Sequence, residues 1–206
     1  MLKRGVLIAI EGIDGAGKST QAEILKDRLE KRGFEVVLLK EPTSSKWGKK
    51  IKEISKNTKS LDPGKELELF IKDRKFNVRN NILPALKNKK IVIVDRYYIS
   101  TIAYQGARGI DKEAIREMNE KFAPKPDIIF ILDINPEESL QRIKREREIL
   151  FEEENFLREV RKNFLEININ KTYVIDARLG VKEIADKIEN LVLQYLKQNS
   201  ICLIPD

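Results

Sequence analysis

An apolar stretch near the start of the chain continues directly into a glycine-rich loop, and this junction constrains the fold more than any other feature. Val6 to Ile10 are consecutive apolar residues, which predicts a buried parallel strand. Residues 12–19 then follow the spacing G-x-x-x-x-G-K-[ST], whose glycines let the backbone turn sharply and approach an anion closely. A helix is expected to begin near Lys18. The sequence thus predicts a strand, a phosphate-binding loop and a helix in succession.

This loop indicates binding of a nucleoside triphosphate. Its inward-pointing amides form an anion-binding nest, and the helix N-terminus adds the positive end of its dipole. In such loops the lysine, here Lys18, reaches the β- and γ-phosphates, and the hydroxyl, here Ser19, is a ligand for Mg²⁺. A chance match is disfavoured because the motif lies between an apolar run and a helical pattern. The candidate ATP-binding residues are Gly12, Ile13, Asp14, Gly15, Ala16, Gly17, Lys18, Ser19 and Thr20.

The rest of the chain alternates between short apolar runs and longer amphipathic segments. A long helix is expected to begin at Asp62-Pro63, with a kink at Pro84. The alternation predicts an α/β fold of the P-loop NTPase type, with a five-stranded parallel sheet between two layers of helices. We find no repeat or linker, so residues 1–206 are expected to form one domain. The four further strands are predicted at 35–40, 91–94, 128–132 and 172–175.

Composition narrows the class of protein. The chain has 206 residues, a net charge of +7 and a single cysteine, Cys202, which cannot form an internal disulfide. It contains no apolar run long enough to span a membrane, and the N-terminus leaves no room for a signal peptide before the first strand, so we expect a cytoplasmic protein. Excess positive charge suits an anionic partner, either nucleotides or nucleic acid. Because the basic residues are not interleaved with aromatic ones, nucleic acid is not expected.

Polar residues follow the predicted strands, at the edge where ligands bind in parallel α/β sheets. Asp95 directly follows an apolar strand, as a magnesium-binding carboxylate does, and is predicted to hold Mg²⁺ together with Ser19. Arg96 beside it suits bidentate capture of a phosphate. Lys40 and Glu41 follow the second strand. A structural ion pair between Asp95 and Arg96, or between either of them and a neighbouring residue, is the alternative interpretation.

The segment 92–106, VIVDRYYISTIAYQG, resembles the signature of the thymidylate kinases, and residues 11–20 resemble the phosphate-binding loop of that family. The pairs Glu41-Pro42, Leu69-Phe70, Asp73-Arg74, Pro126-Asp127 and Leu132-Asp133 also follow the family's order. The resemblance implies a nucleoside monophosphate kinase-like fold and a homodimer. It further implies transfer of a phosphoryl group from ATP, with Mg²⁺, to thymidine 5′-monophosphate (dTMP).

The resemblance also implies roles for individual residues on the acceptor side. Asp14 would meet the sugar 3′-hydroxyl, and Arg96 would hold the acceptor phosphate. Phe70 would stack on thymine and Arg74 would donate to its carbonyl edge. Tyr104 and Gln105 would close around the base and sugar. The candidate substrate-binding residues are Asp14, Lys40, Glu41, Pro42, Phe70, Arg74, Arg96, Ser100, Tyr104 and Gln105.

A lid is expected at about residues 142–155. It carries Arg142, Arg145 and Arg147, any of which could neutralise charge that develops on the transferred phosphoryl group. The candidate catalytic residues are Lys18, Arg96, Asp14, Asp95, Arg142, Arg145 and Arg147. Two positions depart from the family pattern: Lys40 stands where an arginine is usual, and Leu150 stands in the lid where many relatives have arginine.

Several alternatives stay open at this point. A deoxynucleoside kinase of similar fold would use Glu41 as a general base on a sugar hydroxyl, and a nucleic-acid-binding ATPase would also explain the basic charge. The dimer face could involve the apolar residues around Tyr97, Ile99 and Ile102, or the apolar tail at 201–204, although these could equally be core. The choice between dTMP and deoxyuridylate as acceptor is not determined by the sequence.

Overall fold

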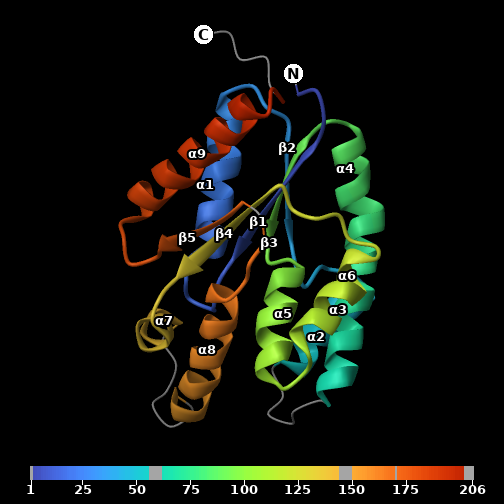
Figure 1. Cartoon of the computed structure of the whole chain (residues 1–206), viewed down its shortest axis with the longest axis vertical. Helices are drawn as coiled ribbons and strands as arrows, with labels where there is room; N and C mark the ends of the chain where they lie inside the picture. Colours follow the sequence, from blue (N-terminus) through green and yellow to red (C-terminus); the bar gives the residue numbers. More distant parts are fainter. Residues whose placement is uncertain (1, 56–61, 144–149, 170, 202–206) are drawn as a thin grey trace.

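The computed structural model describes residues 2–55, 62–143, 150–169 and 171–201 (Figure 1). Strands alternate with helices along this part of the chain, as the sequence predicts. The strands are β1 Val6–Glu11, β2 Val36–Lys40, β3 Ile91–Asp95, β4 Ile128–Asp133 and β5 Thr172–Asp176. The helices are α1 Lys18–Lys31, α2 Lys46–Ile54, α3 Pro63–Asn77, the π-helical turn η1 Val78–Ile82, α4 Leu83–Lys87, α5 Tyr98–Ala107, α6 Lys112–Glu120, α7 Pro136–Ile143, α8 Leu150–Leu165 and α9 Val181–Gln198.

The strands form one five-stranded sheet in the order β2-β3-β1-β4-β5, and every neighbouring pair is parallel. Val6 is paired with Ile91 on one side of β1, and Ile8 is paired with Ile128 on the other. All strands therefore end at the same edge of the sheet. The predicted five-stranded parallel sheet is confirmed, and the polar residues that follow the strands are brought together.

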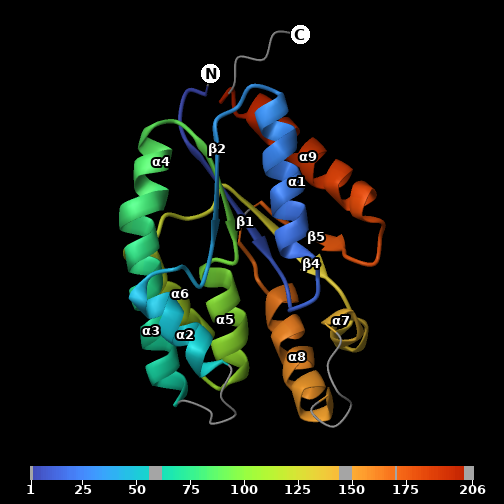
Figure 2. The same ribbon diagram turned by 180° about the vertical axis from the view of Figure 1, so that it is seen from behind.

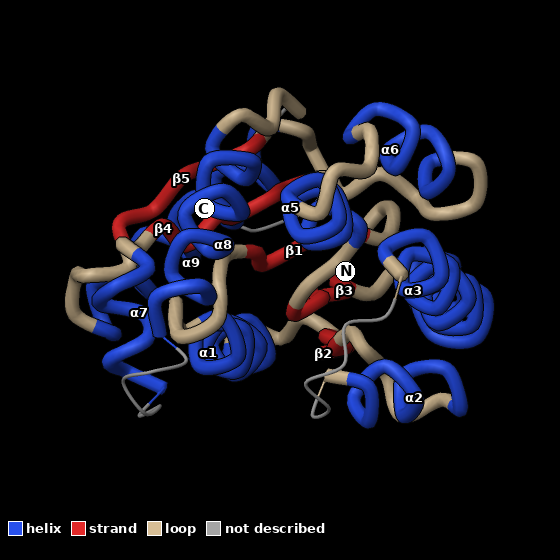
Figure 3. Tube along the Cα trace, turned by 90° about the horizontal axis from the view of Figure 1, so that it is seen from below, coloured by secondary structure: helices blue, strands red, loops and turns tan. Residues whose placement is uncertain are grey.

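Helices cover both faces of the sheet, which gives the predicted three layers (Figures 1 and 2). On one face α1 packs against α9 and against β2 and β3. On the other face α5 packs against α8, and α4 contacts β3. The view along the molecule shows the sheet between α1 and α5 (Figure 3). No helix in the described ranges is both long enough and apolar enough to span a bilayer.

The core lies on both sides of the central strands. β1 and β3 are buried along their whole length, whereas β2 at the edge is half-buried. Tyr97, Ile99 and Ile102, which were considered for a dimer face, are 0–5 % exposed and belong to this core. The interpretation of these three residues as core is therefore the correct one. Of the apolar tail, Ile201 is buried, and residues 202–204 lie outside the described part of the chain.

The long helical segment before β3 contains a feature that the sequence did not predict. Asp62 caps α3 as expected, since its Oδ1 accepts from the Lys65 amide at 3.1 Å. Just before Pro84, where the sequence predicts a kink, the helix passes through the π-helical turn at 78–82 and continues into α4. Because Pro84 lacks an amide N–H, a wider turn just before it accommodates the lost helical hydrogen bond.

Candidate active site

The glycine-rich loop lies at the carboxyl edge of the sheet, directly after β1. Gly12 and Gly15 adopt positive φ values of 140° and 78°. A Cβ atom at Gly12 would lie 2.5 Å from the Leu132 carbonyl oxygen, and one at Gly15 would lie 2.5 Å from the Ser139 carbonyl oxygen. Both positions therefore require glycine for two reasons, backbone conformation and close packing. Ile13 and Ala16 are buried behind the loop, whereas Asp14, Gly17 and Thr20 are exposed.

Lys18 is the first residue of α1 and is only 6 % exposed. Its Nζ donates to the carbonyl oxygen of Ile13, in its own loop, at 2.6 Å. Burial lowers the pKa of Lys18 to about 7, and the nearby positive charge of Arg96 acts in the same direction. A bound phosphate would supply the negative charge that this ammonium lacks, so the side chain suits a polyanionic ligand.

A second cluster at the carboxyl edge of the sheet consists of Ser19, Lys40 and Asp95. Ser19 Oγ donates to Asp95 Oδ2 at 2.5 Å, and Lys40 Nζ lies 2.7 Å from Ser19 Oγ and 2.9 Å from Asp95 Oδ2. Within the described residues, the buried Asp95 Oδ1 has no hydrogen-bond partner. A hydroxyl and a carboxylate thus converge on a position held by a cationic group.

This pair of oxygen donors fits Mg²⁺. Magnesium takes hard oxygen ligands and is commonly bound through one or two protein side chains, with phosphates and waters completing its shell. The described part of the chain contains no cluster of three or more histidine, cysteine, aspartate or glutamate side chains that could form a full protein cage. The arrangement therefore suits a metal that arrives with a nucleotide, held by Ser19 and Asp95.

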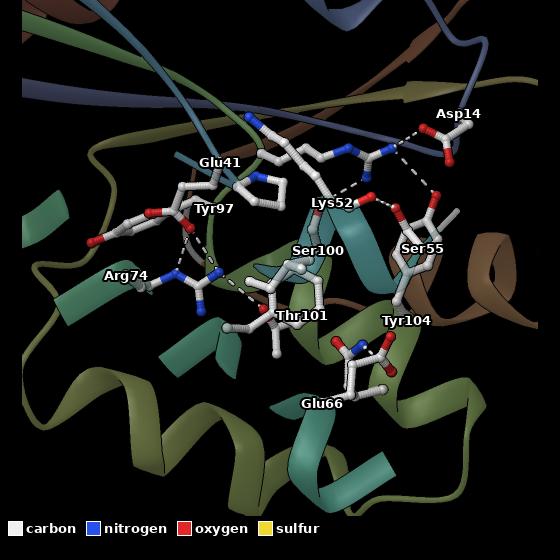
Figure 4. A pocket seen from close by; sticks show the side chains of 15 residues that line it. Asp14, Glu41, Lys52, Ser55, Glu66, Arg74, Tyr97, Ser100, Thr101 and Tyr104 are labelled. Carbon is white, nitrogen blue, oxygen red and sulfur yellow. Dashed lines mark hydrogen bonds and ion pairs between the residues drawn. The ribbon is translucent and has the colours of Figure 1, made fainter. Parts of the chain in front are cut away.

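A cavity of about 320 Å³ opens beside the loop, and Figure 4 shows its lining. Elements distant in sequence build its walls: the loop after β1, the segment after β2, helices α2 and α3, the turn after β3, and α5. Of the predicted substrate-binding set, Lys40 is the one member that does not line it. The lining residues are Asp14, Glu41, Pro42, Ile51, Lys52, Ser55, Glu66, Phe70, Arg74, Arg96, Tyr97, Ser100, Thr101, Tyr104 and Gln105.

Arg96 lies where this cavity meets the glycine-rich loop. Its guanidinium donates to Asp14 Oδ1 at 2.6 Å, to Ser100 Oγ at 3.2 Å and to the Gly12 carbonyl oxygen at 3.3 Å. It also lies over the Tyr104 ring, 5.1 Å from the centroid. The Asp14 side chain is 59 % exposed, so a phosphate could replace it as a partner. Asp95 and Arg96 do not pair with each other, but each forms an ion pair with another residue, Asp95 with Lys40 and Arg96 with Asp14, as the alternative interpretation allows.

Phe70 and Gln105 form the far wall of the cavity. Phe70 is half-buried and lines the cavity, whereas its neighbour Ile71 packs against the core. Gln105 Nε2 donates to Glu66 Oε2 at 3.3 Å, and a carboxylate can only accept, which fixes the amide orientation. In the described residues the buried Gln105 Oε1 has no partner. This wall therefore offers an aromatic face and a hydrogen-bond acceptor.

Arg74 has a different environment from Arg96. Its side chain is 1 % exposed and donates to Glu41 at 2.8 and 2.9 Å, to Asn119 Oδ1 at 2.7 Å and to Thr101 Oγ1 at 2.9 Å. A guanidinium has five N–H donors, so at most one remains for a ligand. Arg74 thus holds the cavity wall, and its contact with a thymine carbonyl stays a prediction.

Glu41 completes this buried network. Its Oε1 accepts from Asn77 Nδ2 at 3.0 Å, and its Oε2 accepts from Arg74. Burial raises the pKa of Glu41, and the charge of Arg74 opposes that rise. Both oxygens are therefore engaged with the protein, which disfavours Glu41 as a general base on a sugar hydroxyl.

The cavity also contains residues that sequence reasoning missed. Lys52 on α2 lines it, with Nζ donating to the Thr43 carbonyl oxygen at 3.2 Å (Figure 4). Glu66 orients Gln105 and also pairs with Arg108. Lys52 belongs to a basic stretch in which the sequence gives no reason to single out one lysine. The apolar spacing of Ile51 and Ile54 was the available signal for the inward face of this helix.

The predicted lid is described in part. Arg142, at the end of α7, donates to the Ala177 carbonyl oxygen at 3.0 Å and to the Gly15 carbonyl oxygen at 3.5 Å, so it lies beside the phosphate-binding loop. Arg145 and Arg147 lie outside the described residues. Leu150 begins α8. The structure therefore brings one of the three candidate lid arginines to the donor side of the site.

Comparison with known proteins identifies the family. A sequence model described as thymidylate kinase matches residues 10–188. A probable thymidylate kinase of Archaeoglobus fulgidus is 48 % identical over 95 % of this chain and 100 % of its own length. The thymidylate kinase of Brachyspira hyodysenteriae is 42 % identical over 92 % and 94 %, respectively, and a probable thymidylate kinase of Pyrococcus horikoshii is 41 % identical over 94 % and 98 %. The chain belongs to the thymidylate kinase family.

Proposed function

We propose that this protein transfers the γ-phosphoryl group of ATP to dTMP, giving ADP and dTDP. One observation carries the proposal: the cavity lined by Phe70 and Gln105 opens at Arg96, whose guanidinium donates to the Gly12 carbonyl oxygen of the phosphate-binding loop. A pocket for an aromatic base and a loop for a triphosphate are thus joined at an arginine. The relatives named thymidylate kinase support the same substrate pair.

On the donor side, the amides of residues 12–19 would hold the triphosphate, and Lys18 would stabilise charge on the transferring group. Ser19 and Asp95 would hold Mg²⁺, which supplies positive charge to the phosphates when it is bound. Lys40, beside both residues, adds a further positive charge at this point. Arg142 lies close enough to the loop to serve as the lid arginine that the sequence predicts.

On the acceptor side, Arg96 and Lys52 would bind the dTMP phosphate, Asp14 the sugar hydroxyl and Phe70 the base. The free Gln105 Oε1 suits the N3–H donor of thymine or uracil, whereas N3 of cytosine is an acceptor. The orientation of this amide, fixed by Glu66, therefore supports a keto pyrimidine as the base. It does not separate dTMP from deoxyuridylate.

The two alternative functions have less support. A nucleoside acceptor needs a base to remove its proton, and both oxygens of Glu41 are engaged with Arg74 and Asn77. A phosphate acceptor is already ionised and needs no such base. For a nucleic-acid-binding ATPase, the relatives give no support, since they are named thymidylate kinases.

We also propose that the protein is a cytoplasmic homodimer. The exposed apolar side chains Phe76, Leu83 and Met118 are 44–47 % exposed and lie on the segment from α3 to α4 and on α6. Lys75 on α3 lies over the ring of Phe122, which follows α6, so the two segments are adjacent. Burying such side chains against a second copy would remove apolar surface from water. Sedimentation or light scattering of Met118→Lys, expected to be monomeric, tests this surface.

An acceptor panel tests the reaction itself. Purified protein with ATP and Mg²⁺ should convert dTMP to dTDP far faster than it phosphorylates thymidine, because Arg96 and Lys52 need an anionic acceptor. Deoxycytidine monophosphate should be a poor acceptor, because its N3 faces Gln105 Oε1. Preference for the nucleoside would contradict the proposal and favour the deoxynucleoside kinase instead.

A further inference from the structure

Glu11 is a fully buried carboxylate that the roles above leave unused. It is the last residue of β1, and its side chain is 0 % exposed. Its Oε1 accepts from the backbone N–H of Tyr97 at 2.7 Å, and its Oε2 accepts from Ser100 Oγ at 2.5 Å. A buried carboxylate is costly unless it is well paired, so its position between the donor loop and α5 calls for an explanation.

The contact with Ser100 determines how that hydroxyl faces Arg96. A serine hydroxyl has one hydrogen to donate, and Ser100 donates it to Glu11 Oε2, because an ionised carboxylate can only accept. Burial raises the pKa of Glu11 to about 7, so this direction holds above that pH. The lone pairs of Ser100 Oγ then remain for the Arg96 guanidinium, which donates to this atom at 3.2 Å. A chain of hydrogen bonds with a fixed direction thus runs from Arg96 through Ser100 to Glu11.

The contact with Tyr97 holds the backbone of the same turn. Arg96 has a φ of 69°, in the left-handed region that arginine rarely adopts, so its backbone is strained. Its N–H donates to the Ile10 carbonyl oxygen at 3.1 Å, and the following N–H, of Tyr97, donates to Glu11. The end of β1 therefore binds two successive amides of the turn that carries Arg96.

We propose that Glu11 is a positioning residue for the acceptor phosphate, acting through Ser100 and the Arg96 turn rather than touching either substrate. The proposal rests on the function proposed above. A purely structural role as a cap for α5 predicts that loss of Glu11 weakens folding and leaves the KM values of both substrates unchanged. The positioning role predicts instead a selective defect in the use of dTMP.

The experiment compares Glu11→Gln, Ser100→Ala and Arg96→Ala with the double variants that combine Arg96→Ala with each of the first two. A glutamine has nearly the same size, but its amide cannot accept from both Tyr97 and Ser100. We expect Glu11→Gln and Ser100→Ala each to raise the KM for dTMP about tenfold and the KM for ATP less than twofold. In the Arg96→Ala background each of these substitutions should raise the KM for dTMP by less than a further twofold, because the guanidinium through which they act is absent. Glu23→Gln, at an exposed position of α1, is the matched control and should change neither KM.

Melting curves of all variants separate positioning from folding, and Ser100→Ala retains the test if Glu11→Gln does not fold. The proposal would be overturned if the KM increases for dTMP caused by Glu11→Gln and by Arg96→Ala multiplied fully in the double variant. It would also be overturned if Glu11→Gln raised the KM values for dTMP and ATP equally. If Glu11→Gln and Ser100→Ala both had normal kinetics while Arg96→Ala impaired the use of dTMP, the positioning role would be overturned. The proposed function would then remain intact. A wild-type protein that does not phosphorylate dTMP would overturn both.

Discussion

The donor loop and the acceptor cavity lie side by side but are built in different ways. The loop consists of consecutive residues, 12–19, and binds through backbone amides whose directions follow from the φ values of its glycines. The cavity is lined by side chains from several elements, among them α2, α3 and α5, and its shape depends on a buried polar network. A loop of this kind recognises phosphates in general, whereas the cavity is the part of the site that we propose to select the acceptor.

Two arginines that line the cavity also differ in how they are bound to the protein. Arg74 is 1 % exposed and bound to Glu41, Asn119 and Thr101, so it fixes a wall. Arg96 is partnered by Asp14, whose side chain is 59 % exposed, and can exchange that partner for a ligand. Charge alone does not distinguish the two residues. Their exposure does: the side chains of Arg74 and its partner Glu41 are 1 % and 3 % exposed, whereas those of Arg96 and its partner Asp14 are 15 % and 59 % exposed.

Replacing Lys18 should give the largest change and should affect the donor side. Lys18→Ala removes a charge that stabilises the transferring group, whereas the loop amides remain. We expect kcat to fall by at least about 100-fold, equivalent to about 2.7 kcal/mol, typical of losing one strong transition-state contact. Lys31→Ala at the exposed end of the same helix is the control. Near-normal turnover of Lys18→Ala would show that the loop does not act in catalysis.

Replacing Arg96 should affect the acceptor side. Arg96→Ala leaves the dTMP phosphate without its charged hydrogen bonds, and we expect a loss of about 2–3 kcal/mol in kcat/KM for dTMP. The KM for ATP should change little. Steady-state kinetics with each substrate varied in turn measures both values, with the exposed Arg79→Ala as control. Equal losses for both substrates would contradict the division between loop and cavity.

Phe70 tests whether the far wall binds the base. Phe70→Ala should cost about 1–3 kcal/mol of stacking, mainly as a raised KM for dTMP. If Phe70 were only core, truncation would instead lower the free energy of unfolding by roughly 3–5 kcal/mol and leave that KM unchanged. Phe34, which packs against the core, offers the contrast: Phe34→Ala should lower the melting temperature without changing either KM.

Changing the pH should give a smaller effect, confined to the donor side. Because burial lowers the pKa of Lys18 to about 7, this group is mostly neutral above that pH in the free protein. Phosphates favour the charged form, so ATP binding takes up a proton and weakens as pH rises, by at most about tenfold per pH unit. Calorimetric titration in buffers of different ionisation enthalpy measures the uptake between about pH 7.5 and 9, where phosphates are fully ionised. Lys18→Ala should abolish it; proton uptake that persists in this variant would exclude Lys18 as the source.

The contrast between the two regions also explains what could be predicted from the sequence. The loop is local, so its spacing specified the donor site, and the alternation of strands and helices specified the sheet. Phe70 and Gln105 were found through the family resemblance, whereas Arg96 was also indicated by its position directly after a strand, and the structure brings the three into one cavity. Lys52 and Glu66 were missed because they contribute through tertiary contacts that leave no local pattern.

Two further features depended on tertiary structure. The engagement of Arg74 with Glu41 links residues that are 33 positions apart, and no spacing rule connects them. Glu11 lies in the motif itself, but its partners Tyr97 and Ser100 are on another element, 86 and 89 positions away. Buried polar networks of this kind are determined by packing, which the sequence pattern does not report.

Equilibrium binding tests the division between donor loop and acceptor cavity most directly. The dissociation constants of ATP and of dTMP should be measured separately for the wild type, Lys18→Ala and Arg96→Ala. The account predicts that Lys18→Ala weakens ATP and retains dTMP, and that Arg96→Ala weakens dTMP and retains ATP. Parallel weakening of both ligands in both variants would contradict it.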